Sequence, residues 1–284
     1  MTVSGKALCA GVAGWPVSHS LSPRLHNHWL RAHGVDGAYV PLAIAREHLA
    51  EALKGLRLAG FKGVNLTIPH KEAAFALAHE LDAAAQAAGA VNLLIFKDDG
   101  TLEGRNTDAE GLAESLRVAG VALSGKPATL LGAGGAARAA ILALDASGAG
   151  EIRILNRHPD RAAVLANALA PFVKAKLKPA AMSDWPATAR DAGLLVNATS
   201  AGMKDQPALD LPLDPLPTSA AVCDLIYNPL ETALLKNAKA RGHKTVDGLG
   251  MLMYQAAPSF AAFYGVTPKV TPELRGELER ALQA

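Results

Sequence analysis

The sequence has little cysteine, few aromatic residues and no long apolar run. Of its 284 residues, 2 are cysteines and 5% are Phe, Trp or Tyr. Cys9 and Cys223 are too few for a disulfide framework, so we expect buried, reduced thiols. No apolar stretch reaches the roughly 18 residues that a membrane-spanning helix needs. Residues 1–14 lack the charged flank, apolar stretch and cleavage site of a signal peptide, which predicts a cytoplasmic protein.

An excess of charge of one sign is also absent. The 28 Lys and Arg residues nearly balance the 26 Asp and Glu residues, and the formal net charge is +2. Because no run of Lys or Arg marks a surface for nucleic acid, we expect no nucleic acid as partner. The lack of a membrane-spanning run predicts no membrane partner either. Metal-ligand spacing is missing too, so no metal is predicted. His19, His26 and His28 lie close together, but a helix-face or capping role is favoured over ligation.

What the sequence does contain is an alternation of short β-type runs and longer helical runs rich in Ala and Leu. Apolar residues make up 50% of the chain, enough for a large core, and the length favours two domains. The alternation predicts βαβ units and a parallel sheet. Asp98-Asp99-Gly100, between the runs 91–96 and 101–104, indicates a hairpin. A second βαβ series begins at Pro127, and residues 209–217 are expected to form a loop.

A glycine-rich turn follows the predicted strand 128–131. Its residues, Gly132-Ala133-Gly134-Gly135-Ala136-Ala137, fit the dinucleotide-binding pattern G-x-G-x-x-G/A. The first Gly permits a tight turn, the second lets the backbone approach a pyrophosphate, and the third position must be small. The next helix presents free N–H groups to the phosphates. A turn that only packs helix on strand is the alternative, which the strand before and the helix after disfavour.

The end of the next strand distinguishes NAD from NADP. An NAD enzyme usually has Asp or Glu there, whereas this sequence has Asn156-Arg157. Arg157 can bind a 2′-phosphate through paired charge-assisted hydrogen bonds. Arg161, one helical turn later, can add to the same positive pocket. NADP is therefore the predicted cofactor, and a merely solvated Arg157 is the alternative.

Four clusters of polar residues lie at the ends of predicted strands or in the loops after them, where α/β proteins bind their ligands. Each cluster alone has a second interpretation, since Ser20, Ser22 and Asp108 also suit helix caps. The clusters are residues 18–23 (SHSLSP), 65–71 (NLTIPHK), 89–92 (GAVN) and 106–108 (NTD).

With four further motifs, these clusters occur in an order that resembles the shikimate dehydrogenase family. The first cluster extends back to Gly14 and is followed by His26-Asn27. The further motifs are GAGGA (132–136), NATSAGM (197–203), DLIYNP (224–229) and GLGMLMYQAA (248–257). The resemblance spans residues 14–257, and the joint order is far more specific than any single motif.

The resemblance implies an enzyme that interconverts 3-dehydroshikimate and shikimate with NADPH or NADP, with Lys71 and Asp108 as the catalytic pair. The residues implied to hold the ring hydroxyls and carboxylate of the substrate are Ser20, Ser22, Thr67, Asn92, Asp108, Tyr227 and Gln255. The residues implied to bind the cofactor are Gly132, Ala133, Gly134, Gly135, Ala136, Asn156, Arg157, His158, Arg161, Thr199, Leu225 and Gly248, the last two at the nicotinamide end.

The residue types agree with this chemistry. Hydride that arrives at a carbonyl carbon leaves charge on the oxygen, which needs a nearby proton donor. The Lys71 ammonium can supply that proton, Asp108 can orient the ammonium, and His70 is a weaker candidate for the base. One position departs from the family, which often has the residues Asn-Arg-Thr after the second Rossmann strand. In this sequence the third of these residues is His158 instead of Thr. The hydroxyl contact to a 2′-phosphate is lost, although His158 can itself donate one.

The fold prediction is an α/β protein of two domains, with the active site in the cleft between them. Residues 1–107 form the substrate domain and residues 108–246 the Rossmann-type NADP domain. Residues 247–284 are C-terminal helices that return to the substrate domain, because Gln255 is expected at the substrate. A quinate/shikimate or aminoshikimate dehydrogenase is the nearest alternative. An alternative from a different class of protein is a non-catalytic NADP-binding sensor. A homodimer stays open.

Overall fold

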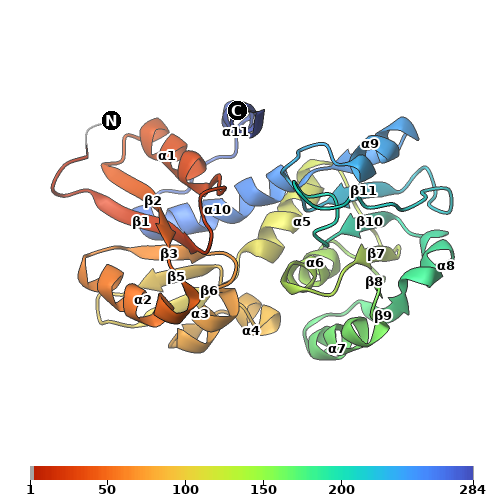
Figure 1. The fold of residues 1–284 in the computed structure, drawn as a ribbon, viewed down its shortest axis with the longest axis horizontal. Coiled ribbons are helices and arrows are strands. Elements are labelled where there is room, and N and C mark those ends of the chain that lie inside the picture. Colours follow the sequence, from red (N-terminus) through yellow and green to blue (C-terminus); the bar gives the residue numbers. More distant parts are fainter. Residues whose placement is uncertain (1–2, 284) are drawn as a thin grey trace. The chain divides into compact units, whose positions relative to one another are not determined.

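The computed structural model describes residues 3–283, which form two compact units (Figure 1). One unit runs to Thr107 and resumes at Gln255, and the other runs from Asp108 to Tyr254. The second boundary lies inside helix α10 (Gly248–Tyr264), whereas the prediction from the sequence ends the Rossmann domain at residue 246. Each unit has its own six-stranded sheet.

The first unit has a mixed sheet with the strand order β2-β1-β3-β5-β6-β4. β1 pairs in parallel with β2 and β3, but β5 is antiparallel to both β3 and β6. The predicted hairpin is thus confirmed, and its strands are antiparallel because the short turn at Gly100 cannot hold the crossover that parallel strands need. The strands are β1 (Leu8–Gly14), β2 (Gly37–Ala43), β3 (Gly63–Leu66), β4 (Glu80–Leu81), β5 (Leu93–Phe96) and β6 (Leu102–Arg105).

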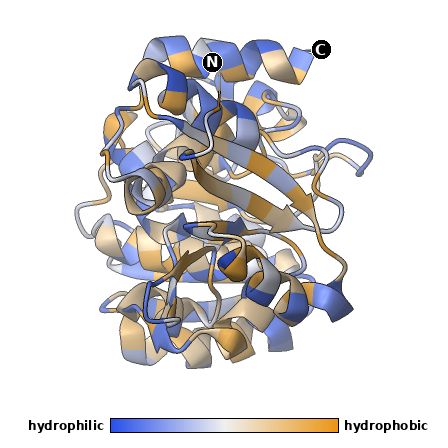
Figure 2. Ribbon diagram, turned by 90° about the vertical axis from the view of Figure 1, so that its left-hand side faces the viewer, coloured by the Kyte–Doolittle hydropathy of each residue, from blue (hydrophilic) through white to orange (hydrophobic). Residues whose placement is uncertain are grey.

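The helices of the first unit enclose a core that includes Leu53, Val64 and Leu94. In Figure 2, α11 is banded with hydrophilic and hydrophobic residues, as expected for an amphipathic helix that buries Leu274 and Leu278. The helices are α1 (Ser22–Ala32), η1 (Arg46–His48), α2 (Leu49–Leu58), α3 (Lys71–Leu77), α4 (Ala83–Ala88), the later part of α10, and α11 (Pro272–Gln283).

The second unit has a wholly parallel sheet with the order β12-β11-β10-β7-β8-β9. The chain moves outward from β7 to β8 and β9, and then continues on the other side of β7 with β10, β11 and β12. This is the Rossmann order, and its ligand crevice lies where the order reverses, at the carboxyl ends of β7 and β10. The strands are β7 (Ala128–Leu131), β8 (Glu151–Asn156), β9 (Lys176–Ala181), β10 (Leu194–Asn197), β11 (Ala221–Asp224) and β12 (Lys244–Val246).

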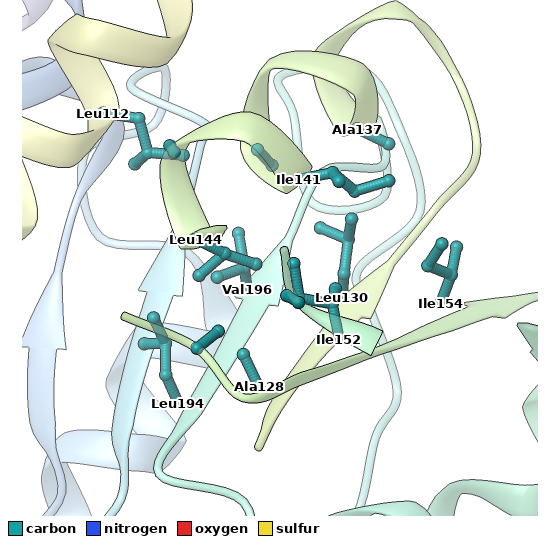
Figure 3. Close-up of a cluster of buried hydrophobic side chains, with 14 of the residues drawn as sticks. Leu112, Ala128, Leu130, Ala137, Ile141, Leu144, Ile152, Ile154, Leu194 and Val196 are labelled. Carbon is teal, nitrogen blue, oxygen red and sulfur yellow. The ribbon is translucent and has the colours of Figure 1, made fainter. Parts of the chain in front are cut away.

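Apolar side chains of this sheet pack against the helices on one face. Figure 3 shows Leu130, Ile154 and Val196 of the strands beside Ile141 and Leu144 of α6. The predicted loop 209–217 is confirmed, since it contains neither helix nor strand. The helices are α5 (Asp108–Val118), α6 (Gly135–Ala146), α7 (Pro159–Leu169), η2 (Ala170–Phe172), η3 (Met182–Asp184), α8 (Trp185–Ala189) and α9 (Ala233–Ala240). Within residues 3–283, no helix has the length and apolar character to cross a membrane.

Candidate active site

Three side chains of the first unit, Asn92, Thr107 and Gln255, form a hydrogen-bonded group that we call the Asn92 group. Asn92 is buried, its Oδ1 accepts from Thr107 N at 2.9 Å, and its Nδ2 donates to Thr107 Oγ1 at 3.0 Å and to Gln255 Oε1 at 3.3 Å. Thr107 Oγ1 also donates to Gln255 O at 2.8 Å. Asn92 precedes β5 and Thr107 follows β6, so the pairing of these strands brings two of the predicted polar clusters together.

Lys71 and Asp108 each begin a helix, α3 in the first unit and α5 in the second. Lys71 is half-buried, and its carbonyl oxygen accepts from Val91 N at 2.9 Å. Asp108 follows Thr107 directly in the chain. The backbone of Lys71 is therefore bonded to the residue before Asn92, and Asp108 is the next residue in the chain after Thr107.

Asn65, at the end of β3, supports this arrangement. Its Nδ2 donates to Asn92 O at 3.0 Å and to Ser259 Oγ at 2.8 Å, and its Oδ1 accepts from the Tyr39 hydroxyl at 2.7 Å. All four residues are buried. Asn65, Tyr39 and Ser259 were absent from the predicted site residues. The available signal was an Asn within an otherwise apolar strand, since a buried amide requires hydrogen-bond partners.

The loops that carry Ser20, Ser22 and Thr67 also meet within the first unit. Trp15 N donates to Ile68 O at 3.1 Å, and a Cβ on Gly14 would lie 2.5 Å from Thr67 Cγ2. Thr67 is half-buried, as is Ser20, and Ser22 is buried at the start of α1. Ser20 Oγ accepts from Ser22 N at 3.3 Å, but the N-cap residue of α1 is Leu21 and no side chain caps this helix start.

Three of the histidines contact other residues of the first unit, as expected for a structural role. His70 is buried, and its Nε2 donates to the carbonyl oxygen of Ile44 at 2.8 Å. His26 is buried and stacks on Tyr39, and burial lowers its pKa to about 3. His28 Nδ1 lies 2.7 Å from Glu277 Oε2. Among residues 3–283, no cluster of His, Cys, Asp and Glu could hold a metal ion.

In the second unit, the glycine turn stands between β7 and α6. Gly132 has φ 107°, and a Cβ there would lie 3.1 Å from Ala198 O, so this position requires glycine. Gly134 and Gly135 are exposed, with open space where a side chain would project, while Ala137 is fully buried against the sheet. The first N–H groups of the 12-residue helix α6 are not capped by any side chain. This turn fits a pyrophosphate, because the backbone is accessible and the helix start attracts anions.

Arg157, His158 and Arg161 are exposed at the end of β8 and the start of α7. Asn156 Oδ1 accepts from His158 N at 2.9 Å, which fixes the turn that carries them. No side-chain hydrogen bond or ion pair of these three residues occurs within the part of the chain that the structure describes. Two cations without an acidic partner fit the 2′-phosphate of NADP.

The loops after β10 and β11 are held by buried polar pairs. Asn197 Nδ2 donates to Asp224 Oδ1 at 3.0 Å, Asn197 Oδ1 accepts from Thr199 Oγ1 at 2.7 Å, and Asp224 Oδ2 accepts from Thr232 Oγ1 at 2.7 Å. Burial raises the pKa of Asp224, and its hydrogen bonds oppose that shift. These pairs place Thr199 and Leu225 at the crevice edge of the sheet. Asn197, Asp224 and Thr232 were not among the predicted site residues.

Two further predicted residues lie close to these loops in sequence or in space. Gly248 N donates to Ile226 O at 3.1 Å, and a Cβ on Gly248 would overlap the carbonyl oxygen of Leu225. Tyr227 is half-buried, and burial raises the pKa of its hydroxyl.

Comparisons with known sequences identify the same two parts of the chain. Residues 12–94 match the family model described as shikimate dehydrogenase substrate binding domain, and residues 113–204 match shikimate / quinate 5-dehydrogenase. The chain is 51% identical over 279 residues to the shikimate dehydrogenase (NADP(+)) of Paramagnetospirillum magneticum, covering 96% of this chain and 98% of that one. It is 50% identical to the enzyme of the same name from Rhodospirillum rubrum, covering 96% and 97%.

Solved structures with the same fold include enzymes with bound ligands. The shikimate 5-dehydrogenase of Thermus thermophilus in complex with NADP(H) and shikimate is 41% identical, with a TM-score of 0.85 and coverage of 97% and 99%. The shikimate 5-dehydrogenase of Listeria monocytogenes in complex with shikimate and NAD is 30% identical, with a TM-score of 0.89 and coverage of 98% of each chain. The quinate dehydrogenase of Corynebacterium glutamicum in complex with NAD is 28% identical, with a TM-score of 0.88 and coverage of 96% and 99%.

The two-unit α/β fold with a Rossmann-type sheet and the family resemblance are both confirmed: the chain belongs to the shikimate dehydrogenase family.

Proposed function

We propose that this chain reversibly reduces 3-dehydroshikimate to shikimate with NADPH. The relatives at 50% and 51% identity carry the name shikimate dehydrogenase (NADP(+)), and they match nearly the whole chain. The observation that carries the proposal is the Asn92 group, a buried set of amides and a hydroxyl that Lys71 and Asp108 adjoin along the chain or through a backbone hydrogen bond. A pair of titratable residues joined to buried amides suits proton transfer at a polar ring.

The substrate would lie against the polar side chains of the first unit. Buried or half-buried Asn92, Gln255 and Thr67 offer amides and a hydroxyl that suit ring hydroxyls, and Ser20 and Ser22 suit the carboxylate. The family resemblance adds Tyr227 and Asp108 to the proposed set. Since buried amides and hydroxyls left without partners cost free energy, such a site rejects rings that lack the matching hydroxyls.

The cofactor would be held by the second unit. The turn Gly132–Ala136 would receive the pyrophosphate, Asn156 the adenosine ribose, and Arg157, His158 and Arg161 the 2′-phosphate. Thr199, Leu225 and Gly248 would border the nicotinamide. When bound, NADPH supplies the hydride that reduces the carbonyl carbon.

Lys71 would act as the general acid. Its ammonium stabilises the negative charge that develops on the carbonyl oxygen and donates the proton that turns this oxygen into a hydroxyl. In the oxidative direction the neutral amine takes the proton back. The Asp108 carboxylate would orient the ammonium and accept a hydrogen bond from the substrate hydroxyl.

A quinate-type activity is the second candidate, because the quinate dehydrogenase of Corynebacterium glutamicum shares the fold at 28% identity. Quinate has an additional hydroxyl on the carbon that bears the carboxylate, so residues near Ser20 and Ser22 would discriminate between the two acids. The aminoshikimate dehydrogenase and the non-catalytic NADP sensor stay open as hypotheses. The cytoplasmic location and a homodimer stay predictions.

The test is the initial rate of NADP reduction or NADPH oxidation, measured by absorbance. Wild type, Lys71→Ala and the control Lys62→Ala, an exposed lysine outside the site, are assayed with shikimate and quinate, each with NADP and NAD. We expect the highest rate with shikimate and NADP. Lys71→Ala should lower kcat about 10²- to 10⁴-fold while the affinity for NADPH, measured by fluorescence titration, is kept.

Three results would point away from this function. Comparable turnover of quinate, or a preference for NAD, would assign the chain to the quinate-type branch. A preference for NAD would also contradict the role of Arg157. Tight NADPH binding without turnover of either acid would support the sensor instead.

A further inference from the structure

A pocket of about 180 Å³ opens on the first unit, and no residue of the proposed active site lines it. Its apolar residues include Leu53, Leu77 and Leu102. Lys54 and Arg57 line it as well, and both side chains carry N–H donors and a positive charge. None of the described residues around it carries a carboxylate. The pocket therefore combines apolar walls with an unbalanced positive charge.

Helix α2 provides one wall through a single face. Ala50, Leu53, Lys54 and Arg57 follow the spacing of three and four residues that places side chains side by side on a helix. Leu53 is 1% exposed and fixes the helix to the core. Lys54 is exposed and Arg57 is half-buried, so the two cations stand at the rim.

Arg57 is placed over the hairpin turn. A Cβ on Gly100 would lie 3.3 Å from Arg57 Nη1, so the absent side chain makes room for the guanidinium. Gly100 has φ 90°, a conformation that favours glycine. Within residues 3–283, neither Arg57 nor Lys54 makes a side-chain hydrogen bond or ion pair. The guanidinium is thus held close to the protein without an anion of the chain to balance it.

His79 adds a third donor. Its backbone N donates to Leu102 O at 2.8 Å, and its Nδ1 accepts from Leu102 N at 2.8 Å. Because Nδ1 is the acceptor, the ring hydrogen is on Nε2, which is therefore a donor. His79 lines the same pocket as Arg57.

The carboxylates of the neighbouring hairpin turn do not balance the positive charge of Lys54 and Arg57. Asp98 and Asp99 are exposed and do not line the pocket. Asp99 Oδ1 accepts from Thr101 N at 2.8 Å, so this carboxylate is engaged within its own turn.

We propose that the pocket binds a small monocarboxylate with an apolar body, such as an aryl-substituted alkanoate. An apolar cavity of about 150 Å³ holds one benzene ring, so the volume suits a single ring. The carboxylate would receive paired hydrogen bonds from Arg57, with Lys54 and His79 as further donors. The leucine walls favour such a ligand over an inorganic anion, because they remove apolar surface from water.

The test is saturation-transfer NMR with 3-phenylpropanoate and the full-length chain, in excess shikimate to occupy the proposed substrate site and without cofactor. We expect saturable binding with a Kd on the order of 1 mM, because a probe with so few atoms can gain only a limited binding free energy. Arg57→Gln should weaken binding about tenfold or more, the effect of one lost charge-assisted pair. Ala50→Leu should abolish it by filling the pocket, and the exposed control Lys62→Gln should leave it unchanged.

Thermal melting of each variant shows that it is folded before binding is compared. The amine of matching shape, 3-phenylpropylamine, should not bind. Displacement of the probe by shikimate, equal binding of inorganic phosphate, or unchanged binding in both Arg57→Gln and Ala50→Leu would overturn the proposal. Because the readout is binding, it is independent of whether the chain turns over shikimate.

Discussion

Among single residues, an aromatic stack supports the buried polar centre of the first unit. The ring of Tyr39 stacks on His26 with centroids 3.9 Å apart, and its hydroxyl donates to Asn65. Asn65 in turn donates to the backbone of Asn92. His26 is 1% exposed, and its Nδ1 has no hydrogen-bond partner among the described residues. A charged His26 is therefore incompatible with this packing.

We predict that His26→Phe reduces the dependence of stability on pH. Burial lowers the pKa of folded His26 from 6.5 to about 3. Below pH 6.5 the unfolded chain binds a proton that the folded chain does not, so stability that is present above pH 6.5 is lost as the pH falls. Between pH 7 and pH 5 this loss is roughly 2 kcal/mol. Urea unfolding of wild type and His26→Phe at both pH values measures the difference.

Phe keeps a ring that can stack on Tyr39 and removes a buried nitrogen without a partner. At pH 7 the two proteins should therefore differ little in their free energy of unfolding. An identical loss between pH 7 and pH 5 in both would show that His26 takes up a proton inside the folded chain.

For helices and strands, the sequence predicts those elements whose pattern is local. The glycine turn before α6 and the hairpin at Gly100 have short, specific signals. Helix α4 does not, because its Ala-rich run lacks periodic large apolar residues, although Asp82 caps its start and Gly89 ends it with φ 60°. Edge strand β9 is missed because Lys and Pro interrupt it.

The same limit applies to the candidate site. Asn92 and Thr107 flank a hairpin that the sequence predicts, but Gln255 is 163 residues from Asn92 and only the family resemblance pointed to it. The pair Asn197 and Asp224 depends on the register of β10 and β11, which places the two residues side by side. Register between strands from distant segments is a tertiary property, so single-sequence patterns do not contain it.

We predict opposite effects for the same substitution in two helices. Gly248 begins α10, and a Cβ there would overlap the carbonyl oxygen of Leu225, so Gly248→Ala should destabilise the protein by about 1–3 kcal/mol. Gly55 lies within α2 with nothing within 4 Å of the added Cβ, so Gly55→Ala should stabilise by about 0.5–1 kcal/mol. Thermal denaturation measures both. A Gly248→Ala protein as stable as wild type would mean that the start of α10 moves freely to make room.

In the whole molecule, the two units differ in how the chain builds them. The second unit is one continuous stretch, and its sheet and core come from within that stretch (Figure 3). The first unit needs both ends of the chain. Ser259 is a partner of Asn65, Trp29 Nε1 donates to Lys269 O at 3.0 Å, and Phe260 packs against Trp29.

We therefore predict that residues 108–254 fold as an isolated fragment, whereas residues 1–107 do not. Without Phe260 and Ser259, the shorter fragment would expose the aromatic stack to water and leave the Asn65 amide without one of its buried partners. Circular dichroism with thermal melting distinguishes the two: a cooperative transition for residues 108–254, and none for residues 1–107.

Joining residues 1–107 to the C-terminal segment tests whether the absence of that segment is what prevents folding. Thr107 Oγ1 lies 2.8 Å from Gln255 O, so the two cut ends are neighbours, and a linker of a few Gly and Ser residues spans them. Residues 1–107 joined in this way to residues 255–284 should regain a cooperative transition. If residues 1–107 already melted cooperatively alone, the C-terminal segment would be an accessory of the first unit instead of part of its core. The contacts of Trp29 and Asn65 with that segment would then contribute little to stability.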